Sequence, residues 1–175
     1  MSKIKWLSKG YQLVAESGFQ ALKVEPLAQE VGISKSSFYH HFADLEVFTE
    51  ALFDHHLDQA KVMAEKEKKA KSIDPELIEI LLEHQLDLLF HRQLKFHQNR
   101  KDFASTIQKA NEFIGEELLM LWIRDLNLPL TQKQLTGVFD LAMENFFLQA
   151  NAENLNEVWL RGFFEQLRKI SLALV

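Results

Sequence analysis

The stretch EVGISKSSFYHHF, Glu30–Phe42, places a glycine between two short helical patterns and decides the fold. Ala28 is small enough for two helices to cross closely, and Gly32 supplies a sharp turn between them. This pattern predicts a helix–turn–helix whose second helix is free to enter a DNA major groove. The apolar residues that would form one buried seam across the two helices are Leu27, Ala28, Val31, Ile33, Phe38 and Phe42.

The outward face of the second helix is polar and carries no carboxylate of its own. Hydroxyl, ammonium and phenol groups donate hydrogen bonds to phosphates and to base edges, whereas a carboxylate would repel DNA. The alternative is an ordinary helical corner with an incidental polar surface. The candidate DNA-binding residues, including the expected N-cap Ser34, are Ser34, Lys35, Ser36, Ser37, Tyr39, His40 and His41.

Helical signals surround this corner in a fixed order. Apolar residues at helical spacing predict an amphipathic helix over residues 3–17, followed by short helices near 25–31 and 35–41. Asp44 is the expected N-cap of a long fourth helix that runs to about Lys71. One helix, a two-helix corner and a long helix therefore fill the first part of the chain.

The composition indicates a globular all-α protein. Of 175 residues, 47% are hydrophobic and 26% charged, with only three prolines and few alternating patterns typical of strands. No apolar run approaches the roughly 18 residues that cross a bilayer, and the first residues lack the core of a signal peptide. The absence of cysteine excludes disulfides and fits a reducing compartment, so we expect a cytoplasmic protein without membrane contact.

Charge is distributed unevenly along the chain. The formal net charge is −5, but residues 1–43 hold five lysines against three glutamates. The first segment is therefore weakly basic and the remainder acidic. This asymmetry suits a small DNA-binding head on an acidic body.

Residues Gly18–Leu52 resemble the TetR/AcrR family of one-component transcriptional regulators. The family core G-(V/I)-S-x-x-x-(F/L)-Y-x-(H/Y)-F is matched from Gly32 to Phe42. The resemblance implies a homodimer that binds palindromic double-stranded operator DNA through the third helix and usually represses. It also implies a DNA-binding domain over residues 1–48, joined by the fourth helix to a ligand-binding and dimerisation domain over residues 72–175.

Two departures from the family pattern bear on DNA affinity. The family commonly opens the second helix with two phosphate-binding threonines, and Lys23-Val24 stands there instead. Lys23 could replace one of these contacts, so we include it among the DNA-binding candidates. The family's lysine at the start of the fourth helix is missing from residues 43–46. Fewer phosphate-binding cations lower the affinity, so a TetR-fold protein with weak or lost DNA binding is the alternative function.

The resemblance further implies an effector that shifts the population of two conformers. We expect the effector, whose identity is unknown, to be a small apolar or amphipathic molecule bound in a largely apolar pocket. The candidate lining residues follow from helix faces and are His84, Leu88, His91, Phe103, Ile107, Asn111, Ile114 and Trp122.

The last two helices would form the dimer interface. Thr131 with Gln134 predicts a capping box for the first of them, and Asn154 with Glu157 predicts the start of the second. Apolar side chains along one side could pair with their symmetry mates, or could merely close the core of their own subunit. The candidate interface residues are Phe139, Ala142, Phe146, Val158, Gly162, Phe163 and Leu167.

An enzyme is the remaining class of function. One predicted helix carries the apolar positions from Leu77 to Leu89, and on it His84, Asp87 and His91 would share a stripe that could bind a divalent metal. No second ligand set and no nucleophile–base pair accompanies them. We therefore expect no catalytic residue, no metal site and no cofactor. His55 and His56 are predicted to face solvent or another domain.

Overall fold

A computed structural model describes residues 2–126 and 131–173, and every regular element in these two ranges is a helix. The predicted all-α class is therefore confirmed. None of the helices in the described ranges is both long enough and apolar enough to span a membrane. The chain folds into two compact units, unit 1 (Met1–Gln59 and Leu86–Gln108) and unit 2 (Ala60–Gln85 and Lys109–Val175).

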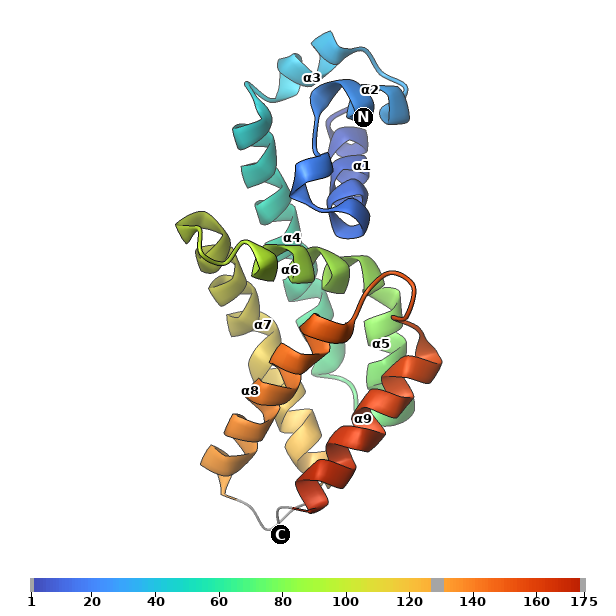
Figure 1. The fold of residues 1–175 in the computed structure, drawn as a ribbon, viewed down its shortest axis with the longest axis vertical. Helices are drawn as coiled ribbons and strands as arrows, with labels where there is room; N and C mark the ends of the chain where they lie inside the picture. The colour runs from blue at the N-terminus through green and yellow to red at the C-terminus, as the bar shows by residue number, and fades with distance from the viewer. Residues whose placement is uncertain (1, 127–130, 174–175) are drawn as a thin grey trace. The chain divides into compact units, whose positions relative to one another are not determined.

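Each unit combines segments that are distant in the sequence (Figure 1). Unit 1 contains α1 (Ser2–Ser17), η1 (Phe19–Ala21), α2 (Val24–Val31), α3 (Lys35–His41), the first part of α4 (Leu45–Glu67) and most of α6 (Gln85–Phe96). Unit 2 contains the π-helical turn η2 (Ile73–Leu77), α5 (Ile78–Glu83), most of α7 (Lys101–Leu126), α8 (Gln132–Gln149) and α9 (Glu157–Leu172). The predicted division placed all residues after 72 together, whereas residues 86–108 pack with the N-terminal helices.

Local capping signals set several helix ends where the sequence predicts them. Gly32 ends α2 in the left-handed conformation, with φ 70°, a conformation that glycine adopts without strain. Asp44 Oδ1 accepts a hydrogen bond from the Val47 N–H at 2.9 Å and caps α4. Thr131 and Gln134 form the predicted capping box at the start of α8.

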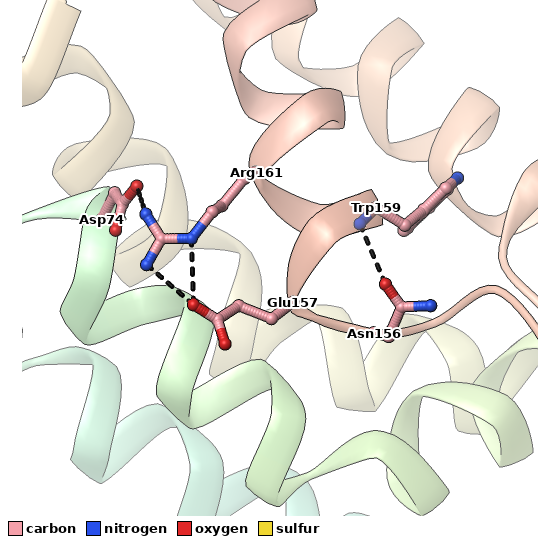
Figure 2. A network of polar contacts seen from close by, with 5 residues as sticks. All are labelled: Asp74, Asn156, Glu157, Trp159 and Arg161. Carbon is pink, nitrogen blue, oxygen red and sulfur yellow. Dashed lines mark hydrogen bonds and ion pairs between the residues drawn. The ribbon is translucent and has the colours of Figure 1, made fainter.

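Three predicted helix boundaries are wrong. The fourth helix, expected to run to about Lys71, ends at Glu67. The helix expected to run from Leu77 to Leu89 is interrupted at His84, where φ is −98° and ψ is 23°. The last helix starts later than expected, because Asn156 rather than Asn154 is its N-cap. Figure 2 shows the Asn156 side chain accepting a hydrogen bond from the backbone N–H of Trp159, at 3.0 Å.

Arg161 joins the first turn of α9 to the segment that precedes α5 within unit 2 (Figure 2). Its guanidinium donates to the carboxylate of Asp74 and, at 3.0 and 2.9 Å, to that of Glu157. The network is exposed, so its contribution to stability is small compared with the apolar core beneath it.

Aromatic rings form the core behind the helix–turn–helix of unit 1. Trp6 of α1 packs edge-on against Phe38 of α3 at 5.4 Å, and Phe38 packs against Phe48 of α4 at 5.2 Å. Gly10 allows α1 and α4 to approach closely, because a Cβ at this position would lie 2.5 Å from the Phe48 ring. The three helices are thereby fixed to one another.

Unit 2 buries the facing sides of α8 and α9, which run in opposite directions (Figure 1). The Phe146 ring of α8 lies 5.3 Å from Trp159 and 5.2 Å from Phe163 of α9. Trp122 of α7 packs against Phe139 of α8 at 5.8 Å. These rings make a continuous apolar interior for the unit.

Candidate nucleic-acid interface

Helix α3, the second helix of the helix–turn–helix, is anchored by one face and presents the other to solvent. Phe38 is fully buried among Trp6, Phe42 and Phe48. The adjacent Tyr39 is 50% exposed, and its ring packs edge-on against Phe38 at 5.4 Å. The phenol is therefore held by the core while its hydroxyl is available to a ligand.

All of the predicted DNA-binding side chains lie in unit 1 and reach its surface. Ser34 is the N-cap of α3 as expected, although its hydroxyl caps no backbone N–H and instead lies 3.4 Å from the Ser36 hydroxyl. Ser37 is half-buried. The exposed members of the set are Lys23, Ser34, Lys35, Ser36, Tyr39, His40 and His41.

A carboxylate does reach this face, from the neighbouring helix. The ammonium group of Lys35 forms a hydrogen-bonded ion pair with Glu25 of α2. The hydrogen bond and the charge of Lys35 lower the pKa of Glu25, and those of Glu25 raise the pKa of Lys35. The expectation of a carboxylate-free face is correct for α3 alone, because sequence spacing did not reveal that α2 brings Glu25 to Lys35.

The N-terminal end of α1 extends the exposed surface next to α3. The Ser2 hydroxyl lies within hydrogen-bond distance of Nε2 of His41, and the Lys3 ammonium lies 5.8 Å from the centre of the Phe42 ring. Lys5 is exposed in the same helix, whereas Lys9 forms an ion pair with Glu30 at 3.3 Å. Two of the five lysines in residues 1–43 are therefore paired with glutamates.

A second polar constellation, which sequence reasoning missed, lies inside unit 1. Tyr11 of α1 is hydrogen bonded to His56 of α4 and to Asp87 of α6, each at 2.8 Å. His56 is also hydrogen bonded to His91 of α6 at 3.2 Å. The prediction that His56 faces solvent is wrong, because its side chain is 2% exposed. Its partner His91 does lie within residues 72–175, the range predicted to form the other domain.

Comparison with known proteins identifies the N-terminal domain. Residues 7–52 match the family model of bacterial regulatory proteins, tetR family. The N-terminal domain belongs to the tetR family. The matched range runs from α1 into α4 and contains the whole helix–turn–helix. The resemblance inferred from Gly18–Leu52 is confirmed for this domain.

The whole chain shares its fold with a solved structure. A transcriptional regulator (TerR/AcrR family) from Aquifex aeolicus VF5 superposes with a TM-score of 0.63 and 16% identity, and the match covers 100% of both chains. A TetR family protein from Vibrio parahaemolyticus matches with a TM-score of 0.45 and 22% identity, over 94% of this chain and 97% of that one. No curated protein sequence matches the chain.

Outside the tetR-family domain, the predicted pocket residues fall into both units. Unit 1 buries four of them, Leu88, His91, Phe103 and Ile107. Unit 2 buries His84 and Trp122. Also in unit 2, Ile114 is half-buried and Asn111 is exposed. A hollow of about 280 Å³ in unit 2 has none of them in its wall. Most of its lining residues are charged; the full set is Lys66, Lys69, Ala70, Glu76, Glu79, Ile80 and Glu83. The effector pocket stays a prediction.

The predicted dimer residues do not share one surface. Phe139, Ala142, Phe146 and Leu167 are buried within unit 2, which favours the alternative that they close the core of their own subunit. These residues belong to the apolar sides of α8 and α9 that pack inward. Of the other three, Phe163 is half-buried, while Val158 and Gly162 are exposed. The large apolar side chains that α8 and α9 expose are Leu141, Leu148, Val158, Ile170 and Leu172.

The three residues of the hypothetical metal stripe are engaged in different interactions. His84 lies at the break between α5 and α6, and its Nε2 is 2.8 Å from the ammonium of Lys66. Asp87 accepts a hydrogen bond from Tyr11, and His91 is bonded to His56. Among the described residues, no three His, Asp or Glu side chains converge as metal ligands.

Proposed function

We propose that the chain is a one-component transcriptional regulator that binds operator DNA through the outward face of α3. The observation that carries this proposal is the geometry of α3 in a tetR-family domain: Phe38 is fixed in the core while Tyr39 and the serines face outward. Side chains of this kind donate hydrogen bonds to phosphates and base edges.

Exposed lysines near α3 support a role in phosphate binding. Lys3 and Lys5 lie on α1, whose N-terminus is next to the end of α3, and Lys23 precedes α2. These cations would compensate for the missing threonine pair and the missing lysine of α4. Each contact to a phosphate adds to the affinity and steepens its dependence on salt.

A homodimer would place two copies of α3 on successive turns of the DNA. The exposed apolar side chains of α8 and α9 support this arrangement, since Leu141, Leu148 and Val158 are 74%, 69% and 82% exposed. A Cβ added to Gly137 of α8 or Gly162 of α9 would meet no atom of the same chain, so each leaves room for a close approach. A second copy is the partner that such a self-complementary helical face fits.

Control by a small apolar or amphipathic effector, and repression as the default outcome, complete the proposed function. Both are extended to this chain from its resemblance to the family. An effector that binds one conformer more tightly would change the separation of the two α3 helices. The setting is the cytoplasm, where operator DNA and effector would both be accessible.

The second candidate function is a TetR-fold protein with weak or lost DNA binding. The ion pair between Lys35 and Glu25 favours it, because a phosphate must compete with Glu25 for the only lysine on α3. In this case the chain would act through ligand binding or protein interaction.

Fluorescence anisotropy of labelled duplexes distinguishes the two functions. The probes are the DNA upstream of the protein's own gene and a duplex enriched from a random library. Regulation predicts sequence-selective binding that weakens with salt and is reduced in the Tyr39→Ala variant. No sequence-selective binding across a salt titration, with Tyr39→Ala indistinguishable from the wild type, would support the second candidate instead.

A further inference from the structure

One chain of hydrogen bonds crosses three helices inside unit 1, and its direction can be deduced. The Tyr11 O–H donates to Asp87 Oδ1 at 2.8 Å. Because the phenol has a single proton, its oxygen must accept the bond from Nδ1–H of His56, also at 2.8 Å. A neutral His56 with its proton on Nδ1 has a lone pair on Nε2, so Nδ1–H of His91 donates to it at 3.2 Å.

This chain of hydrogen bonds is buried along most of its length. Tyr11, His56 and His91 are 4%, 2% and 4% exposed, and the Tyr11 ring stacks on Phe90 of α6 at 4.2 Å. Asp87 is only partly buried, so water and protons reach one end of the chain. Opening the contact between α6 and its neighbours is therefore the step that exposes both imidazoles.

The surroundings of the two rings keep them neutral. Burial, together with a smaller contribution from the charge of Lys95 on α6, lowers the pKa of His91 to about 3. Burial also lowers the pKa of His56 well below its ordinary value, with smaller contributions from His91 and from His55 on α4. On the α1 side, burial and Asp87 raise the pKa of Tyr11, so the phenol keeps its proton as well.

Protonation of both imidazoles is incompatible with this arrangement. His56 would then carry a proton on Nε2 and His91 a proton on Nδ1, so two donors would face each other across 3.2 Å. We propose that the chain is a proton-operated latch: it fastens α6 to α1 and α4 while both imidazoles are neutral, and it opens when they take up protons. The latch needs neither DNA nor an effector.

The latch acts on the support of the recognition helix. Tyr11 and Trp6 lie on the same helix, α1, and Trp6 packs against Phe38 of α3. Once the latch is open, the two imidazoles reach water and titrate near pH 6.5. The equilibrium constant for opening then rises by up to about tenfold for each histidine per pH unit below that value. Above about pH 7.5 opening becomes independent of pH.

The first test is the tautomer of each ring, measured by long-range ¹H–¹⁵N correlation of histidine-labelled protein at pH 7.5. We expect two neutral rings protonated on Nδ1, the tautomer that is less populated in free histidine. Their signals are assigned by loss in His56→Gln and in His91→Gln. A proton on Nε2 of His56 would overturn the proposal, and this measurement on the wild type needs no variant to fold.

The second test is hydrogen exchange of backbone amides at pH 7.5 and 5.5, corrected for the intrinsic effect of pH. We expect protection in α1 and α6 to fall about tenfold for one titrating histidine and up to about a hundredfold for two. Protection in α9 of unit 2 serves as the internal reference and should stay constant. An equal loss in α9, or no loss in α6, would contradict the latch.

Tyr11→Phe removes the link between His56 and Asp87 and should lower the protection of α6 already at pH 7.5. Tyr39→Phe is the matched control, because the chain has only two tyrosines and the other one is exposed. His40→Gln/His41→Gln removes two exposed imidazoles from α3 and should leave the pH response intact. Loss of the response in this control would assign it to the surface and overturn the proposal.

Discussion

Glu25 of α2 and Lys35 of α3 form an ion pair across the turn of the helix–turn–helix. The pair connects the two helices on the surface that would meet DNA. Both side chains are well exposed, so the bond adds little to stability but changes the charge that an approaching phosphate encounters. Under the proposed function, Glu25 would compete with a DNA phosphate for Lys35.

Glu25→Gln is expected to strengthen DNA binding. Release of Lys35 would add one phosphate contact, which corresponds to roughly a fivefold gain in affinity near 0.1 M salt and steepens the salt slope by about 0.9. Anisotropy titrations at several salt concentrations measure both quantities. Glu65→Gln removes the same charge from another exposed ion pair, that with Lys68, and should leave the slope unchanged. An unchanged slope in Glu25→Gln would mean that Lys35 does not contact phosphate.

Tyr39→Phe tests the phenol hydroxyl alone. We expect the affinity for operator DNA to fall about tenfold, the loss of one hydrogen bond to a charged group. The free energy of unfolding should be unaffected because Tyr39 is half-exposed and only its ring packs on Phe38. Binding equal to that of the wild type would remove Tyr39 from the interface.

Gly10→Ala should destabilise the DNA-binding domain. The new methyl group would meet the Phe48 ring at 2.5 Å, and overpacking of this kind costs roughly 1–3 kcal/mol. Gly137→Ala is the matched control in another helix, where a Cβ meets no atom within 4 Å. The control should be neutral or slightly stabilising. Urea unfolding of both variants measures the difference, and equal stabilities would show that α1 can shift away from Phe48.

The free energy of unfolding should decrease as the pH falls below about 6.5. The pKa values of His56 and His91 are lowered in the folded state, so the unfolded chain binds more protons in acid. The contribution of each histidine to stability is fully present at a pH above the pKa that the histidine has in the unfolded chain. Below that pKa the contribution decreases by about 1.4 kcal/mol per pH unit. For His91 the loss continues until about pH 3. Urea unfolding at several pH values from 7.5 to 5 gives the free energy of unfolding at each pH. This free energy should depend less steeply on pH in His56→Gln/His91→Gln than in His40→Gln/His41→Gln.

Leu141→Glu/Leu148→Glu should convert the proposed dimer to a monomer. Both side chains are exposed on α8, and a pair of carboxylates there would be desolvated in an interface. Light scattering after size exclusion gives the mass directly. Ile4→Glu, at an equally exposed apolar position on α1, should leave the mass unchanged. A wild-type monomer at micromolar concentration would reject this interface.

The helix–turn–helix could be predicted because its signals are local. Gly32, Asp44 and the spacing of the buried rings each act within a few residues of the chain. The break at His84 could not be predicted, since the apolar pattern continues through it from α5 into α6. Helical periodicity reports which residues are apolar but not whether the backbone bends between them.

Positions that depend on distant segments were the ones that sequence reasoning missed. Tyr11, His56 and Asp87 meet only because residues 86–108 pack with the N-terminal helices. Similarly, α8 is apolar on more than one side, and sequence alone did not show that Phe139 and Phe146 face inward while Leu141 faces outward. Which of two apolar faces is covered within a chain is settled by tertiary packing.

Unit 1 is built from two separate stretches of sequence, which limits how its helix–turn–helix could be moved to another protein. A fragment that ended at Gln59 would strip Phe90 from the Tyr11 ring and Phe103 from Phe19 and Phe53, leaving bare aromatic surface in water. A functional graft onto another scaffold would have to carry residues 86–108 as well. Recombination at a single crossover point therefore cannot exchange unit 1 intact.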